Sequence, residues 1–193
     1  MWKVLQKTLL PIWPSDRTQI NGKPIGDAWP LKLLADHAQK IGDKSPTAAI
    51  QPFHKLTQWL AYSLRVPFVR VLGVTWANGD LGTGLSEYRN GGLFVDTGAL
   101  TLKPELAKKA TQPGDTLPKF DSTDDVIVEW RAMTVALLDE LHRIILERME
   151  GVQLSLAQVL EAGSWKSGRE LAAELRPMTK SSPILLAGDG TLF

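Results

Sequence analysis

Acidic side chains at two distant places in the chain have the chemical character that hydrolysis needs. Glu87 and Asp96 lie in a glycine-rich stretch, residues 77–98, and Glu129 follows three apolar residues. A carboxylate beside a reacting carbon can stabilise developing positive charge or move a proton. We therefore take these three carboxylates as candidate catalytic or binding groups.

Two arginines lie close to these carboxylates in the sequence. Arg89 is two residues after Glu87, and Arg131 is two residues after Glu129. Burying an ionised carboxylate is costly unless a cation compensates it, so each arginine is the expected compensator. We expect Glu129, beside Trp130 near the start of a helix, to be partly buried. Two interpretations stay open: the charged groups surround a polar ligand, or a Glu–Arg pair fixes the loop to the helix with no chemical role.

Other common chemistries lack their residues in this chain. The absence of cysteine excludes disulfides, thiolate zinc sites, iron–sulfur clusters and a cysteine nucleophile. The histidines, His37, His54 and His142, show no helical ligand spacing. Gly82-Thr-Gly84 lacks the third glycine of a dinucleotide-binding loop. We therefore expect no metal ion and no cofactor.

The composition excludes several broad classes of protein. The chain has 193 residues, of which 44% are hydrophobic and 22% charged, as in folded globular proteins and unlike disordered ones. Its 22 basic and 21 acidic residues give a net charge of +1, which argues against a nucleic-acid or membrane-surface partner. No apolar segment approaches the ~20 residues that span a bilayer, so we expect a cytoplasmic protein.

Apolar residues at helical spacing predict a mainly α fold. The clearest helix covers 53–64, and we expect it to bury a stripe formed by Phe53, Leu56, Trp59, Leu60 and Leu64. The longest helix begins near 122–124 and ends near 150, with a predicted stripe of Val126, Trp130, Met133, Leu137, Leu141, Ile144 and Ile145. Further helices are predicted over 3–10, 31–41, 104–110, 155–162 and 166–175. We expect Pro67 either to end the helix that covers 53–64 or to begin a new one. Residues 66–76 could form a buried helix or a strand.

The remaining segments predict a small β element and a long loop. Asn21-Gly22 supplies the positive φ angles of a tight turn, so 18–25 is expected to be a hairpin. A second hairpin is expected over 184–193, around Gly188-Asp189-Gly190. Six glycines indicate that 77–98 is a structured loop of the kind that often carries function. The sequence thus predicts a mainly α fold, a helical domain with a small β element of two hairpins. We expect residues 1–193 to form a single domain.

Several segments together resemble an uncharacterised protein family of the fungal-type uracil catabolic (URC) pathway. The segments are 10–14, 53–60, 87–96, 129–132, 160–166 and the terminal Asp189-Gly-Thr. Members of that family are substantially longer, so the resemblance implies that residues 1–193 correspond to the C-terminal half of a longer architecture. It also implies a role in pyrimidine degradation.

The chain is distantly similar to the queuosine-salvage nucleoside glycosylases as well. Three blocks match in the same order: Phe53-His54-Lys55-Leu-Thr-Gln58, Glu87-Tyr88-Arg89 followed by Gly98-Ala-Leu100 and Pro104-Glu-Leu106, and Glu129-Trp-Arg131-Ala132. Those enzymes hydrolyse an N-glycosidic bond with a loop aspartate, whose position Glu87 occupies here. Asn90-Gly91-Gly92 departs from the family's Val-Pro-Gln, which implies that the base is recognised differently.

These resemblances imply the roles of the candidate residues. Glu87 would be the catalytic carboxylate, and Lys55 would set its charge or bind a ribose or phosphate oxygen. Glu129 would bind ribose hydroxyls, Asp96 a urea-like amide, and Arg89 and Arg131 would hold the carboxylates. Tyr88 and Trp130 are possible walls, and the implied binding set is completed by His54, Gln58 and Asn90.

The resulting hypothesis is hydrolysis of the C1′–N bond of a ribosylated uracil-degradation intermediate, such as a ribosylurea. The expected partner is a small riboside substrate. One alternative is a noncatalytic binding subunit or a fragment that docks on a separate partner chain supplying the N-terminal half. A third is an amidohydrolase acting on a ureido group, although the metal or activated nucleophile that it would need is not evident in the sequence.

Overall fold

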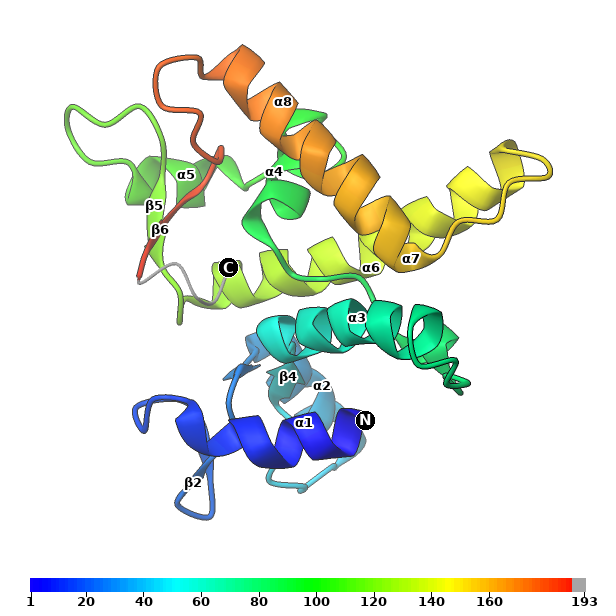
Figure 1. Ribbon diagram of the computed structural model, residues 1–193. Coiled ribbons are helices and arrows are strands. Elements are labelled where there is room, and N and C mark those ends of the chain that lie inside the picture. Colours follow the sequence, from blue (N-terminus) through cyan, green and yellow to red (C-terminus); the bar gives the residue numbers. More distant parts are fainter. Residues whose placement is uncertain (189–193) are drawn as a thin grey trace. The chain divides into compact units, whose positions relative to one another are not determined.

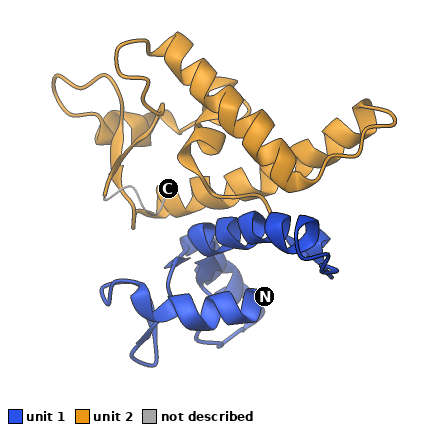
Figure 2. Ribbon diagram, viewed as in Figure 1, with its two compact units in different colours: residues 1–82 blue, residues 83–193 orange. Residues whose placement is uncertain are grey.

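Helices form most of the described structure, residues 1–188, in the computed structural model of the chain (Figure 1). The mainly α prediction is confirmed, and the strands are two or three residues long and form two-stranded sheets. The chain divides into two compact units, Met1–Gly82 and Thr83–Phe193 (Figure 2). The expectation that 1–193 is a single domain stays a prediction. No helix within 1–188 has the length and apolar character needed to cross a membrane.

Unit 1 combines helices with two antiparallel strand pairs. Its elements are α1 (Trp2–Leu9), the 3-10 turn η1 (Leu10–Ile12), β1 (Gln19–Ile20), β2 (Lys23–Pro24), β3 (Ala28–Pro30), α2 (Lys32–Ile41), β4 (Ile50–Pro52), α3 (Lys55–Arg70) and the 3-10 turn η2 (Gly79–Leu81). The first hairpin is confirmed, because β1 pairs antiparallel with β2 and the turn residues Asn21 and Gly22 have φ angles of 51° and 73°. Strand β3 pairs antiparallel with β4.

Helix α3 is longer than the sequence predicts and buries a different face. It continues through Pro67 to Arg70, so Pro67 neither ends it nor begins a new helix. The prediction that 66–76 forms a buried helix or a strand is wrong, since a turn and irregular backbone follow Arg70. The predicted stripe is also wrong as a buried face, because Leu56, Trp59 and Leu60 are exposed.

Unit 2 is built around the short helix α4 (Tyr88–Asp96), which contacts three other helical segments. Its other elements are α5 (Pro104–Ala110), β5 (Lys119–Asp121), α6 (Asp125–Arg148), α7 (Leu156–Gln158), the π-helix η3 (Val159–Trp165), α8 (Lys166–Leu175) and β6 (Leu185–Ala187). Helix α4 lies inside the stretch predicted to be a loop. The glycines that suggested a loop, Gly91 and Gly92, are buried in the helix. A Cβ atom on Gly92 would lie 3.2 Å from Pro183 Cδ and 3.3 Å from Ser182 Oγ, so glycine here serves close packing.

Helix α8 lies directly against α4, as Figure 1 shows. A Cβ atom at Gly168 would lie 2.1 Å from the carbonyl oxygen of Arg89, so only glycine allows the two backbones to approach this closely. The helix predicted for 155–162 begins at Ser155, whose side chain forms a capping box with Gln158. The chain then passes through the π-helix into α8 without a break, which the sequence did not predict.

The buried face of α6 includes polar residues. Ile127, Arg131, Thr134 and Leu138 recur at helical spacing and are almost completely buried. The predicted stripe is only partly right: Trp130 is buried in a cluster with Ile127 and Ile184, whereas Met133 and Ile144 are exposed. Arg131 and Thr134 can be buried on this face because both form hydrogen bonds within unit 2.

The strand expected after Ile184 forms as β6, and its partner is β5. The two strands are parallel, with Phe120 opposite Leu186. The rest of the expected second hairpin, including Asp189, Gly190 and the terminal Asp189-Gly-Thr segment, lies outside the described residues.

The contact between α8 and α4 predicts that replacing two different glycines by alanine changes the free energy of unfolding by very different amounts. Replacing Gly168 by alanine should lower the free energy of unfolding by about 2 kcal/mol, because the methyl group must displace the Arg89 carbonyl or separate the helices. Gly163→Ala is the matched control, since its Cβ would meet only Val159 Cγ1 at 3.8 Å. Urea unfolding monitored by circular dichroism measures both changes, and equal midpoints for the two variants would contradict the packing described.

Candidate functional site

Glu87 caps the N-terminus of α4 with its side chain. Its Oε2 atom accepts hydrogen bonds from the backbone N–H groups of Arg89, at 2.8 Å, and Asn90, at 3.3 Å. The carboxylate therefore lies where the helix dipole is positive and the first N–H groups need acceptors. Glu87 is half-buried, so its position is fixed while part of the side chain stays accessible.

The residues beside Glu87 are fixed by α6. The Arg131 guanidinium, 1% exposed, donates from Nη2 to Ser86 Oγ at 3.1 Å. The Trp130 indole N–H donates to the carbonyl oxygen of Gly91 at 3.2 Å. The stretch that holds Glu87 is therefore attached to α6 by hydrogen bonds from Arg131 to Ser86 and from Trp130 to Gly91.

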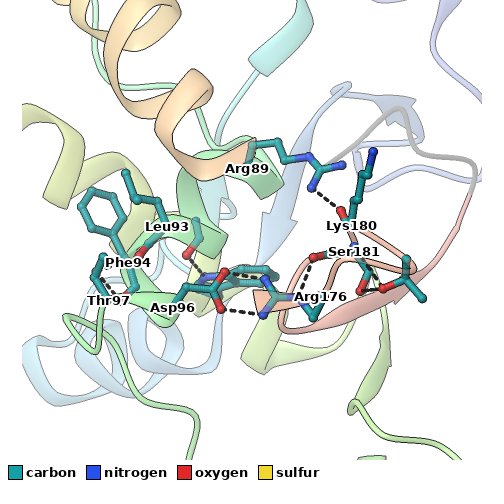
Figure 3. Close-up of polar contacts among 11 residues, drawn as sticks. Arg89, Leu93, Phe94, Asp96, Thr97, Arg176, Lys180 and Ser181 are labelled. Carbon is teal, nitrogen blue, oxygen red and sulfur yellow. Dashed lines mark hydrogen bonds and ion pairs between the residues drawn. The ribbon is translucent and has the colours of Figure 1, made fainter. Parts of the chain in front are cut away.

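The π-helix and the segment after α8 fix the other residues of this helix terminus. Asn90 is 2% exposed and accepts a hydrogen bond on Oδ1 from Ser164 Oγ at 3.1 Å. Arg89 donates from Nη1 to the carbonyl oxygen of Lys180 at 2.6 Å (Figure 3). The Arg89 guanidinium also lies 4.6 Å from the centre of the Tyr88 ring. Backbone and side-chain contacts from three segments thus determine where α4 begins.

Asp96, at the opposite end of α4, forms a two-point ion pair with Arg176 (Figure 3). Arg176 Nη1 lies 2.9 Å from Oδ1 and Nη2 lies 2.5 Å from Oδ2, while Nε donates to the Ser181 carbonyl oxygen. The side chains of Asp96 and Arg176 are 5% and 15% exposed. Both carboxylate oxygens are therefore engaged, which favours a structural role over the amide-binding role suggested by the resemblance.

Glu129 is exposed, and the expectation that it is partly buried is wrong. Successive residues of a helix are rotated by about 100°, so Glu129 lies on nearly the opposite side of α6 from Ile127 and Arg131. It lines a small, mainly apolar cavity of about 110 Å³ together with Trp130, Leu100, Leu102, Met133 and Ile184. Glu87 is not among the residues that line this cavity, and the ribose-binding role of Glu129 stays a prediction.

Three predicted site residues, His54, Lys55 and Gln58, lie in unit 1 at the start of α3. Lys55 is 5% exposed, and its backbone N–H donates to Asp27 Oδ2 at 3.0 Å. Asp27 is completely buried and also accepts a hydrogen bond from the Trp29 indole at 2.8 Å. Asp27 thus organises the end of α3 that carries these residues. The proposed roles of Lys55, His54 and Gln58 stay predictions.

His54 occupies the N-cap position of α3 with a φ angle of 48°. Burial lowers the pKa of its imidazole below the ordinary value of 6.5, although the negative charge of Asp27 opposes this change. Its ring lies edge-on to Trp2, with centroids 6.5 Å apart. His54 is therefore predominantly neutral at neutral pH and contributes a polar, uncharged group to this end of the helix.

Sequence reasoning missed four polar residues that organise these two regions. They are Asp27, Ser86, Ser164 and Arg176. Ser164 belongs to a segment singled out by the resemblance, but its partner Asn90 is 74 residues away in the chain. Within 1–188, no group of three or more histidine, aspartate or glutamate side chains is arranged to hold a metal ion.

Comparison with known proteins identifies relatives along the whole chain. A family model described as protein of unknown function (DUF1688) matches residues 1–193. The chain is 53% identical over 196 residues to Protein urg3 of Schizosaccharomyces pombe and 45% identical over 201 residues to Uracil catabolism protein 4 of Lachancea kluyveri. Both matches cover 100% of this chain but only 44% and 45% of the relatives, so the chain spans less than half their length. No solved structure matches the chain.

The comparisons confirm the resemblance to the uracil-catabolism family. The distant similarity to the queuosine-salvage glycosylases stays a prediction.

The ion pair at the end of α4 predicts a specific loss of stability. Asp96→Asn should lower the free energy of unfolding by about 3 kcal/mol, because it leaves the guanidinium of Arg176 largely buried without its counter-charge. Glu170→Gln is the matched control, since Glu170 pairs with Lys166 at 3.8 Å and both side chains are more than two-thirds exposed. We expect no measurable change for the control. Similar losses in the two variants, measured by urea unfolding, would argue against a structural role for Asp96.

The lowered pKa of His54 predicts how stability depends on pH. Just below pH 6.5 the unfolded chain binds a proton at this histidine that the folded chain does not, so acidification in this window should destabilise the protein. His54→Asn should make the fall shallower, and asparagine tolerates the positive φ angle. His37→Asn, at an exposed position on α2, should keep the original slope. The measurement is a series of urea unfolding curves between pH 5 and 7.5, and identical slopes for the wild type and His54→Asn would exclude this role of His54.

Proposed function

The chain belongs to the DUF1688 family, and we propose that it acts in uracil degradation by hydrolysing the N-glycosidic bond of a ribosylated, ribosylurea-like intermediate. The name of one relative, Uracil catabolism protein 4, supports the pathway. The proposed chemistry rests on the site in unit 2 and on the predicted similarity to nucleoside glycosylases, which would put Glu87 at the position of their catalytic aspartate.

The observation that carries this proposal is the fixed carboxylate of Glu87. Two backbone N–H groups hold its Oε2 atom, and the neighbouring residues are attached to α6, η3 and the segment after α8. A group held in this way needs little reorganisation when charge develops beside it, which is the condition for strong electrostatic catalysis. An ordinary N-cap residue is held only by the N–H groups of its own helix. Around Glu87, the neighbouring residues are also held by three further segments.

The proposed reaction breaks the bond between C1′ of the ribose and a urea nitrogen. The bonding electron pair leaves with the nitrogen, and positive charge spreads over C1′ and the ring oxygen. The Glu87 carboxylate stabilises this charge and orients a water molecule, whose oxygen then bonds to C1′. One proton of the water ends on the departing nitrogen, so the products are ribose and urea.

The neighbouring residues would position the substrate and the carboxylate. Tyr88 is half-buried and stacks with Arg89, which gives a flat wall beside the carboxylate. Arg131 and Asn90 are buried and bonded to Ser86 and Ser164, so we assign them to positioning Glu87.

The proposal predicts that Glu87→Gln slows hydrolysis of ribosylurea by about a thousandfold. The protein should still fold, because the amide oxygen of glutamine can accept the same two N–H groups, although the neutral group no longer stabilises the cationic transition state. Mass spectrometry of free ribose and urea measures the rate, and circular dichroism establishes the fold.

Glu105→Gln is the matched control for this experiment. Glu105 is an exposed carboxylate in the first turn of α5, so its loss should leave the rate unchanged. If Glu87→Gln turned over at the wild-type rate, Glu87 would not be catalytic. If the wild-type chain released no ribose from ribosylurea or its 5′-phosphate, the proposed activity itself would be wrong for this chain.

A further inference from the structure

One face of α3 is apolar and exposed along most of the helix. Leu56, Trp59, Leu60 and Val66 are 40%, 55%, 37% and 49% exposed, and we call this set the α3 stripe. Val71, which directly follows the helix, extends it and is 78% exposed. A contiguous apolar surface of this kind is uncommon on a protein that works alone and is typical of a binding surface.

The spacing of the α3 stripe is that of a helix face made for packing. Trp59 and Leu60 follow Leu56 by three and four residues, and Val66 follows Trp59 by seven, so the members share one side of the helix. The other side of the helix is more buried, since Thr57 is 2% exposed and Ala61, Leu64 and Phe68 are half-buried. The helix therefore has one buried side and one exposed apolar side.

The charged residues of α3 itself have one sign. The helix contains no aspartate or glutamate, whereas it contains Lys55, Arg65 and Arg70. A complementary partner would present apolar side chains with carboxylates at the edge.

We propose that the α3 stripe is the docking surface for the polypeptide segment that makes up the remaining part of the family chain. In both relatives more than half of the length lies outside the match to this chain, so the family includes a segment of sufficient size to cover the stripe. Trp59 lies near the middle of the stripe and is the expected anchor, because tryptophan dominates the binding energy of many interfaces. The stripe belongs to unit 1 and Glu87 to unit 2, and the docking proposal does not depend on the proposed reaction.

The test is co-expression of this chain with the part of the Schizosaccharomyces pombe relative that lies outside the match, as a separate polypeptide. Size-exclusion chromatography with light scattering should give the mass of a one-to-one complex. Trp59→Glu and, independently, Val66→Glu should each weaken the complex at least tenfold in titration calorimetry. Both positions are exposed, so the variants should unfold at the wild-type temperature.

Leu33→Glu is the matched control, because Leu33 is a 63% exposed leucine on another helix of unit 1, α2. Its affinity should equal that of the wild type. The proposal would be overturned if no complex formed, or if both stripe variants bound as tightly as the control. It would also be overturned if the chain alone formed a dimer that Trp59→Glu dissociates, because the stripe would then bind a second copy of this chain.

Discussion

The close approach of α8 to α4 is the constraint on which the arrangement of unit 2 depends. Glycine at position 168 lets the helix lie against the Arg89 carbonyl, and Gly92 of α4 allows Ser182 and Pro183 to pack closely against the same helix. Larger residues at these positions would push α4 away from its neighbours. The carboxylate of Glu87 lies at the beginning of this helix, so its position follows from how closely the backbones pack.

The carboxylates at the two ends of α4, those of Glu87 and Asp96, have different surroundings and therefore different roles. Glu87 lies at the N-terminus, where the helix dipole favours negative charge and two N–H groups bind its side chain. Asp96 lies at the C-terminus, where the dipole disfavours negative charge, and Arg176 compensates it in a largely buried ion pair. This difference favours Glu87 as the group with catalytic capacity and Asp96 as a structural group.

The exposed apolar face of α3 agrees with the finding that this chain matches less than half of the length of its relatives. An apolar stripe at helical spacing is typical of a helix face that packs against another surface, yet the stripe on α3 is exposed. The same unit carries a buried polar centre, in which Asp27 accepts hydrogen bonds from the Trp29 indole and the Lys55 backbone. The exposed stripe is therefore best understood as one half of an interface.

The sequence by itself determined the mainly α fold, the turn at Asn21-Gly22, helix α5 to the residue and the capping of the helix after Ser155. These features depend on neighbours within a few residues, where turn geometry and capping chemistry act. It also singled out Glu87, because a carboxylate among glycines stands out as a pattern. Only the tertiary structure decided that 88–96 is a helix, since glycine lowers local helix propensity and the gain comes from packing against α8. It likewise decided that Glu129 is exposed while Arg131 is buried, and that Asn90 and Ser164 are partners, because burial and long-range hydrogen bonds depend on residues that the chain brings together only on folding.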